Sequence, residues 1–389
     1  MKRLLIYGYY GTSNTGSDAR LNQIIKDVKK LNKDIEISVA VFNQYNESVI
    51  PNNIRIIKMP FIPIISTIYL MFLSLKFDII INGEGIPYTD FCGKGFLALF
   101  LPVLFFANHL NKFTVSYAFD IDKLTKLDTY ITKKVLEKTN LLITRTKESY
   151  YEIKEMGISN VYLSADPAFL YKNNLNFKIE KKISFAIKDL YCYPIKFSLL
   201  GKKEDIYKYP YFYKYENKGK EKYNKFITDL TKLIEKLSKN YKINLIAMED
   251  FMDKKINQDL LKNLKNNSKV SFFSSKTNHP QKIKKELITS KLVISTRLHA
   301  LILSTDNSIP FIGISNDERI DYFFKEYGLS DLCINYKIKD LIKEIEEKID
   351  YTNTNYTDIK EIISSKTKKM KKRASFNHNI LKQSLTSVK

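Results

Sequence analysis

The sequence has few of the residues that form disulfide bridges or bind metals. It contains three cysteines and four histidines among 389 residues. Cys92, Cys192 and Cys333 lie far apart, without the CxxC or Cys/His spacings that mark structural disulfides and zinc sites. We therefore expect neither a disulfide framework nor a metal site.

The sequence also lacks a hydrophobic run long enough to cross a membrane, which takes about 20 residues. The most apolar stretches, Phe61 to Leu75 and Phe96 to Phe106, are shorter and contain Pro63 and Pro102. They are predicted to form buried helices or, alternatively, helices that lie at a membrane interface. No secretory signal is recognisable at the N-terminus. The prediction is a cytoplasmic protein, with peripheral contact at the inner face of the cell membrane as the open alternative.

Charge is the strongest compositional bias. The chain has 64 Lys and Arg against 42 Asp and Glu, which gives a net charge of +22. Such a protein attracts nucleic acids, acidic lipid headgroups and phosphorylated substrates. Because the lysines are scattered and no nucleic-acid-binding motif is present, we do not expect a nucleic acid partner.

Short apolar segments alternate with helical patterns, which predicts an α/β fold with mostly parallel sheets. The alternation begins at residues 4–9 and restarts at Ile183 after a polar linker. We expect an N-terminal domain at 1–175 and a C-terminal domain at 183–345, facing a central cleft, followed by a helix and basic tail at 355–389. A Tyr- and Lys-rich insertion at 189–223 is predicted to be either a flap over the substrate or an exposed β-hairpin.

The most informative segment is an apolar strand pattern, Leu292 to Ile294, that ends in Ser295-Thr296-Arg297-Leu298-His299. In open α/β sheets, ligands bind at the carboxyl ends of strands. Thr296 would offer a hydroxyl, and Arg297 a fork of donors for a carboxylate or phosphate. His299 is the side chain best suited to proton transfer near neutral pH.

Other predicted strand ends carry candidate ligands as well. The first strand runs into a turn with Gly11, Asn14, Gly16 and Asp18, which is neither a GxGxxG motif nor a P-loop. We expect either that this turn binds an anion at the helix N-terminus or that Ser17 and Asp18 only cap the helix.

Two further strand ends place charged residues at the same edge. Glu84 follows one strand between two glycines and suits a general acid or base, or an exposed turn. Arg145 closes another strand and forms a surface ion pair or faces the cleft.

These motifs resemble those of the polysaccharide pyruvyltransferase family. The resemblance extends from Gly8 to about Leu329. The matching segments are the Gly11…Asn14…Gly16 turn, Arg145 to Ile158, Asp166 to Phe169, Ser295 to Ala300 and Pro310 to Ser315. The sequence departs from the family pattern at Gly16 to Arg20, at Asn82 to Gly85, at Lys188, where the family often has arginine, and at Asn316.

The resemblance implies two Rossmann-like domains in a GT-B-like arrangement. It also implies transfer of a pyruvyl group from phosphoenolpyruvate, as donor substrate and without a cofactor, to two hydroxyls of a cell-surface polysaccharide or lipid-linked precursor, forming a ketal. Arg297 and Arg145 would hold the donor, near Lys188, and His299 would be the general acid or proton shuttle. The alternatives are a GT-B glycosyltransferase with a nucleotide-sugar donor and a non-catalytic glycan- or lipid-binding relative.

Overall fold

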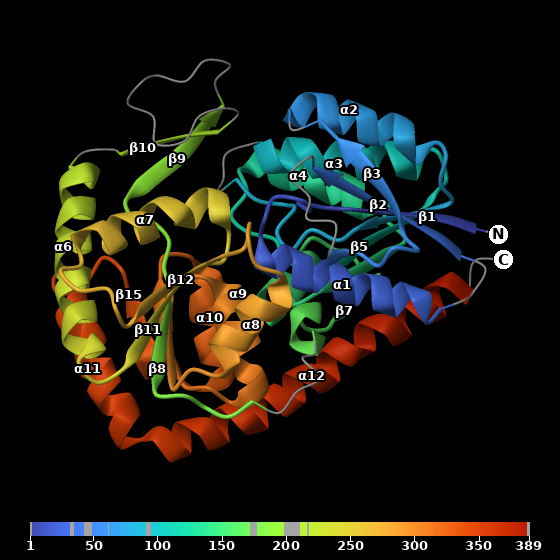
Figure 1. Cartoon of the computed structure of the whole chain (residues 1–389). Helices are drawn as coiled ribbons and strands as arrows, with labels where there is room; N and C mark the ends of the chain where they lie inside the picture. The colour runs from blue at the N-terminus through green and yellow to red at the C-terminus, as the bar shows by residue number, and fades with distance from the viewer. Residues whose placement is uncertain are drawn as a thin grey trace.

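The computed structural model describes residues 2–31, 35–42, 49–60, 62–90, 95–171, 177–197, 211–215 and 218–386. The chain folds into two α/β halves, each built around its own parallel sheet (Figure 1). The predicted fold class, two Rossmann-like units in a GT-B-like arrangement, is confirmed.

The sheet of the first half is parallel, in the order β3-β2-β1-β4-β5-β6-β7. Its strands are β1 (Lys2–Tyr7), β2 (Ile35–Phe42), β3 (Arg55–Met59), β4 (Ile79–Asn82), β5 (Phe113–Phe119), β6 (Leu141–Thr144) and β7 (Val161–Leu163). Its helices are α1 (Thr15–Lys29), α2 (Pro63–Ser74), α3 (Gly95–His109), α4 (Lys126–Leu136) and α5 (Lys147–Glu155). The strand order reverses between β1 and β4, and such switch points are where open sheets bind ligands.

The sheet of the second half is parallel, in the order β12-β11-β8-β13-β14-β15, and reverses between β8 and β13. Its strands are β8 (Lys182–Ala186), β11 (Lys242–Ala247), β12 (Val270–Ser274), β13 (Leu292–Ser295), β14 (Phe311–Ser315) and β15 (Cys333–Asn335). Its helices are α6 (Gly219–Ser238), α7 (Asp250–Asn263), α8 (Pro280–Ile288), α9 (Leu298–Ser304), α10 (Glu318–Tyr327) and α11 (Leu341–Thr354).

The Tyr- and Lys-rich insertion contains an antiparallel pair, β9 (Cys192–Phe197) and β10 (Tyr211–Tyr215). This pairing agrees with the β-hairpin alternative. The loop between the strands, including Tyr207 and Tyr209, lies outside the described residues. Figure 1 shows the hairpin projecting from the second half.

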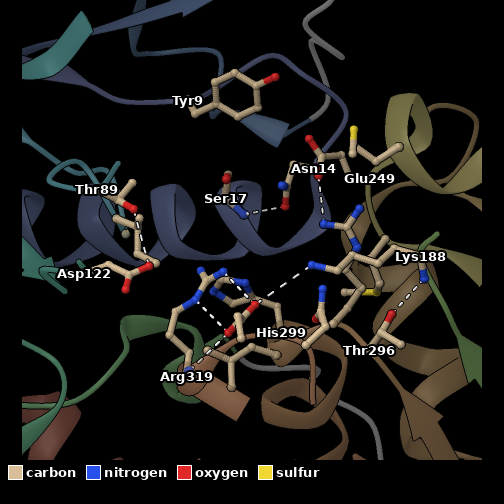
Figure 2. Close-up of a pocket in the computed structure, with 18 of the residues that line it drawn as sticks. Tyr9, Asn14, Ser17, Thr89, Asp122, Lys188, Glu249, Thr296, His299 and Arg319 are labelled. Atoms are coloured by element: carbon tan, nitrogen blue, oxygen red, sulfur yellow. Dashed lines mark hydrogen bonds and ion pairs between the residues drawn. The ribbon is translucent and has the colours of Figure 1, made fainter. Parts of the chain in front are cut away.

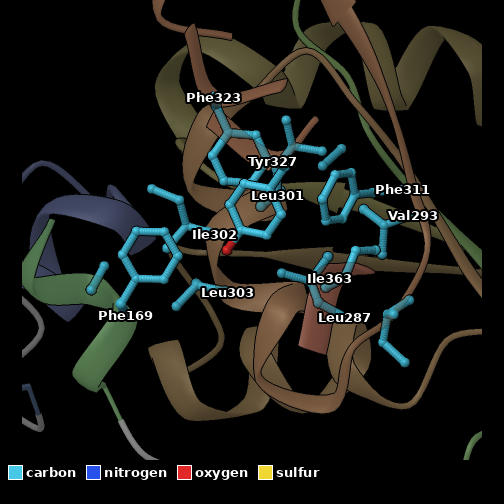
Figure 3. Close-up of a cluster of buried hydrophobic side chains, with 14 of the residues drawn as sticks. Phe169, Leu287, Val293, Leu301, Ile302, Leu303, Phe311, Phe323, Tyr327 and Ile363 are labelled. Atoms are coloured by element: carbon cyan, nitrogen blue, oxygen red, sulfur yellow. The ribbon is translucent and has the colours of Figure 1, made fainter. Parts of the chain in front are cut away.

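A dense apolar core fixes the position of α9 (Figure 3). Leu301 and Leu303 of this helix are fully buried, and the aromatic rings of Phe311 and Tyr327 meet edge to face with centroids 5.8 Å apart. Edge-to-face pairs add to the energy gained by burying the ring surface. The first turn of α9, which carries His299, is therefore anchored by its apolar continuation.

The two apolar stretches, which form α2 and α3, differ in how far they are buried. In α3, Phe100, Val103 and Leu104 are buried, as predicted for a core helix. In contrast, α2 leaves Ile64 and Phe72 largely exposed. In the described part of the chain, no helix combines the length and the hydropathy needed to cross a membrane.

The C-terminal helix α12 (Tyr356–Thr386) joins the two halves. Figure 1 shows it running from α11 across the lower face of the molecule to the first half. Ile363 packs in the core of the second half and Leu381 in a core of the first. Arg373, in the basic run of the predicted C-terminal helix and tail, donates from Nη2 to the Ser164 carbonyl at 2.7 Å and from Nη1 to Glu326 at 3.0 Å. The basic run is thus part of the connection between the halves.

Candidate active site

A cavity of about 240 Å³ lies between the carboxyl ends of the two sheets (Figure 2). In the view of Figure 2, Tyr9 lies above it, Asn14 and Ser17 mark the start of α1, and Thr296 and His299 lie below. Most of the predicted site residues line this cavity: Asn14, Glu84, Arg145, Lys188, Thr296, Arg297 and His299. These residues are far apart in the sequence, and their positions at or after the carboxyl ends of strands bring them together, as the rule that ligands bind at strand ends predicted.

The cavity lining does not include Gly11, Gly16 or Asp18. Gly11 has a φ of 76°, and a Cβ atom there would lie 2.5 Å from the Phe42 carbonyl oxygen. The turn therefore requires glycine for its backbone and for close packing. Asp18 is buried in the first turn of α1, and this burial raises its pKa to about 7. Direct ligand binding by these residues stays a prediction.

Position 16 requires glycine because its backbone is in contact with His299. A Cβ atom at Gly16 would lie 2.3 Å from His299 Nδ1 and 2.4 Å from Cγ. The imidazole of the second half therefore packs directly on the backbone at the start of α1, in the first half. Asn14 accepts hydrogen bonds from the Gly16 and Ser17 amides at 3.0 and 3.2 Å, which fixes this helix start.

Behind the imidazole lies a buried ionic cluster centred on Asp166. Its Oδ2 atom is 2.9 Å from Arg20 Nη1 and 2.5 Å from Arg145 Nη1. Arg145 Nε also donates to Asp120 at 2.6 Å. Burial alone would raise the pKa of Asp166, but the charges of Arg20 and Arg145 hold it well below its usual value. Asp166 is thus a permanent carboxylate, and pairing makes its burial tolerable.

The imidazole of His299 faces this carboxylate without a hydrogen bond. Nε2 lies 3.4 Å from Asp166 Oδ2 and has no hydrogen-bond partner among the described residues. Burial lowers the pKa of His299, and the charges of Arg145 and Arg20 lower it further, whereas Asp166 acts in the opposite direction. The net lowering of the pKa favours the neutral ring, which can accept a proton.

Arg297 is held by carboxylates of α7 and the turn that precedes it. Its Nη1 donates to Glu249 at 3.0 Å and its Nε to Asp253 at 3.0 Å. Burial raises the pKa of both carboxyl groups, although Arg297 opposes the shift. Thr296 accepts a hydrogen bond from the Lys188 amide at 2.7 Å, so its hydroxyl positions the loop after β8.

A third cationic group contains a residue that the sequence motifs did not indicate. Arg319 donates from Nη2 to Asp317 at 2.9 Å, and Lys188 Nζ lies 4.0 Å from the same carboxylate. Burial acts to raise the pKa of Asp317, but the charges of Arg319 and Lys188 lower it to about 2. Both Asp317 and Arg319 follow β14, so the strand-end rule could have found them. Arg20 lies inside α1, where no such signal exists.

The halves also meet through their backbones beside the cavity. The Thr15 amide donates to the Met248 carbonyl at 2.8 Å, and the Asp250 amide donates to the Ser13 carbonyl at 3.2 Å. The glycine turn of the first half is therefore fastened to the β11–α7 junction of the second. The site is assembled from both halves.

Comparison with protein families identifies this arrangement. The model of the polysaccharide pyruvyl transferase family matches residues 14–318, which include the Asn14 turn, Arg145, Asp166 and the Arg297–His299 segment. The chain belongs to this family. It is therefore an enzyme, and the family implies a polysaccharide acceptor. No match is found among curated individual proteins.

Solved structures show the same fold at low sequence identity. A UDP-GlcNAc 2-epimerase from Neisseria meningitidis has a TM-score of 0.59 at 12% identity, with 100% of both chains covered. A sucrose-phosphate synthase from Thermosynechococcus elongatus has a TM-score of 0.58 at 7% identity, covering 100% of this chain and 98% of the other. The corresponding epimerase from Methanocaldococcus jannaschii has 0.57 at 14%, covering 90% and 92%. At these identities the likeness establishes the GT-B-like fold alone.

Within this pyruvyl transferase fold, the cavity contains side chains of the types suited to anion binding and to proton transfer. Three groups of cationic side chains surround a neutral imidazole. They are Arg20 with Arg145, Arg297, and Lys188 with Arg319. Guanidinium and ammonium groups in a confined site bind carboxylates and phosphates. A small, highly charged anion could therefore be bound within reach of His299.

Proposed function

We propose that the protein transfers a pyruvyl group from phosphoenolpyruvate to two hydroxyls of a cell-surface polysaccharide or of its lipid-linked precursor. The observation that carries the proposal is the imidazole of His299 in one cavity with three cationic groups, Arg20 with Arg145, Arg297, and Lys188 with Arg319. Family membership supports the reaction class. The donor is a substrate, and the chemistry of the reaction requires no cofactor.

Arg145 and Arg297 are proposed to bind the carboxylate and phosphate of the donor. The bonds from Arg145 to Asp120 and Asp166 use two of the five guanidinium N–H groups. The remaining groups can donate toward the cavity that Arg145 lines. Lys188 and Arg319 border the same cavity, and we assign them to the phosphate as additional positive charge.

The pKa of His299 favours a proton shuttle over a simple general acid. In the first step, an acceptor oxygen bonds to C2 of phosphoenolpyruvate, and its proton passes through the imidazole to the methylene carbon, which becomes a methyl group. An imidazole that is neutral at rest can take this proton and return it. The ring thus ends the step as it began.

The second step completes the ketal. A second hydroxyl oxygen bonds to C2 while the bond from C2 to the phosphate oxygen breaks. The phosphate leaves with the bonding electrons and takes up the second hydroxyl proton. Two neighbouring hydroxyls of one sugar are needed for a cyclic ketal, so the acceptor carries a 1,2- or 1,3-diol.

We place this reaction in the cytoplasm, on the inner side of the cell membrane. Cys192 and Cys333 carry free thiols, which suits a reducing compartment. Lipid-linked glycan precursors are exposed at the cytoplasmic face of the membrane that carries them. The setting therefore gives one enzyme access to both donor and acceptor.

The first experiment tests the donor by ligand-dependent thermal stabilisation of the full chain. Phosphoenolpyruvate should raise the melting temperature more than inorganic phosphate does, because it adds a carboxylate. The same measurement with UDP and UDP-GlcNAc tests binding of a nucleotide-sugar donor. Stabilisation by the nucleotides but not by phosphoenolpyruvate would contradict the proposal and favour a nucleotide-sugar transferase.

The second experiment tests the role of His299 by phosphate release from phosphoenolpyruvate with hexoside diols. His299→Gln should lower kcat about 10²–10⁴-fold, the usual contribution of a proton-transfer residue. His279→Gln is the matched control, because His279 precedes α8 and does not line the cavity. Equal turnover by His299→Gln and wild type would refute the role assigned to His299. If wild type bound the donor but released no phosphate with any acceptor, the result would favour a non-catalytic relative.

A further inference from the structure

Helix α2 turns most of its large apolar side chains to the surface, unlike an ordinary surface helix. Its buried face carries Ser66, Thr67 and Ser74 beside Leu70, and Thr67 donates to the Ala98 carbonyl of α3 at 3.2 Å. A surface helix normally turns its large apolar side chains inward and its polar ones outward. Here small polar side chains make up most of the buried face, with Leu70 as its fully buried apolar member.

The exposed face of α2 consists of large aliphatic and aromatic side chains. Ile64 is 63% exposed, Ile68 50%, Phe72 64% and Leu75 47%. Ile65 and, on the neighbouring helix α3, Phe105 are exposed as well. Contiguous apolar surface of this kind marks a contact with a partner or a membrane.

Charges around this face have one sign. Residues 61–77 and 95–112, which contain α2 and α3, include no Asp or Glu. Lys76 is exposed just after α2, Lys58 is exposed in the preceding strand β3, and Lys112 Nζ donates to the Leu75 carbonyl at 3.3 Å. An apolar stripe bordered by lysines complements the acyl chains and headgroups of an anionic bilayer.

We propose that the exposed face of α2, defined by Ile64, Ile65, Ile68, Phe72 and Leu75, docks the protein on an anionic lipid bilayer. A helix of 12 residues is about 18 Å long, shorter than the ~30 Å hydrocarbon core, so α2 lies in the interface and does not cross it. A second copy of this chain is a poorer occupant, because two molecules of net charge +22 would bring lysine-bordered faces together.

The position of α2 in the fold limits how the docked protein can lie on the bilayer. Figure 1 shows α2 on the upper face of the first half, on the same side as the hairpin of β9 and β10 and opposite α12. Cys192, at the start of β9, lines the cavity. Docking through α2 therefore turns the hairpin side of the molecule, and not α12, toward the lipid.

The test is co-sedimentation of the full chain with vesicles. Vesicles of equal parts phosphatidylglycerol and phosphatidylcholine should bind the protein more tightly than pure phosphatidylcholine, and salt should weaken the binding. The double variant Ile68→Asp/Phe72→Asp should lower the affinity about a hundredfold, because each buried side chain contributes about tenfold or more. Ile338→Asp/Tyr351→Asp, at exposed apolar positions of the second half, is the matched control and should bind as wild type does.

Equal binding by the α2 variant and wild type, or no binding to either vesicle, would overturn the proposal. A dimer in light scattering that the α2 variant abolishes, without vesicle binding, would assign the face to a second copy instead. Melting temperatures of both variants show whether the fold is kept. The vesicles contain neither donor nor acceptor, so this result is separate from that of the phosphate-release assay.

Discussion

Replacing Gly16 with alanine would place a methyl group against the imidazole of His299. The new Cβ atom would lie 2.3 Å from Nδ1, whereas ordinary contacts begin at 3.4 Å. The ring must therefore move by about 1.1 Å, the difference between these distances. The backbone of α9 cannot follow, because Leu301 and Leu303 are buried in the core of the second half. The side chain has to swing away from its place beside Asp166.

This displacement sets the expected loss of activity. A shift of about 1 Å in a catalytic group costs about 10²-fold in rate, which corresponds to about 2.7 kcal/mol of transition-state stabilisation. Stability should change much less, because alanine is favoured over glycine in a helix by up to about 1 kcal/mol, which offsets part of the steric cost. Gly16→Ala is thus expected to lower the activity strongly while changing the stability little.

The assay is kcat/KM for phosphate release from phosphoenolpyruvate, together with the melting temperature of each protein. Gly328→Ala is the control, for which we expect the opposite result: lower stability with unchanged activity. Gly328 ends α10 at a φ of 69° with nothing within 4 Å of an added Cβ, so alanine there costs about 1 kcal/mol of backbone strain without touching the site. If Gly16→Ala kept kcat/KM within about threefold of wild type, less than about 0.7 kcal/mol, the contact would not position the imidazole for catalysis.

Three further substitutions test the charges and the connection between the halves. Asp166→Asn leaves Arg20 with an uncompensated buried charge and Arg145 with Asp120 alone, and we expect the free energy of unfolding in urea to fall by about 3–5 kcal/mol. Asp18→Asn should stabilise the protein at pH 8 but not at pH 4. Because burial raises the pKa of Asp18 to about 7, wild type loses up to about 4 kcal/mol as the pH rises from about 4 through 7, and identical urea curves at pH 8 would contradict this. Arg373→Ala removes bonds from α12 to both halves and should cost about 1–3 kcal/mol in the same measurement, and an unchanged urea midpoint would count against that connection.

The position of the site was predictable because parallel strands end at one edge of their sheet. An apolar run such as Leu292 to Ile294 reads as a buried strand, and the residue that follows it must lie at that edge. The same reasoning placed Glu84 and Arg145 around the cavity from strands of the other half. Local sequence was enough here, since each residue is one or two positions from its strand.

The pairing of the charges was not predictable from the same signals. Arg20 meets Asp166 across 146 residues, and only the tertiary fold brings α1 to the end of the first half. Sequence also left the surface of α2 undecided. The composition of a helix shows that it is apolar, but tertiary contacts such as the bond from Thr67 to the Ala98 carbonyl of α3 decide which side faces outward.

The state of His299 depends on both halves being in place. Its ring comes from the second half, whereas Gly16 and the cluster of Asp166 and Arg145 belong to the first. Closure buries the imidazole and brings it near two guanidinium groups, and both effects lower its pKa. In an open arrangement these effects would be absent, and the ring would titrate nearer its ordinary value. The backbone bonds between residues 13–15 and 248–250 therefore do more than join the halves: by holding them together, they keep the imidazole buried beside the two guanidinium groups that lower its pKa.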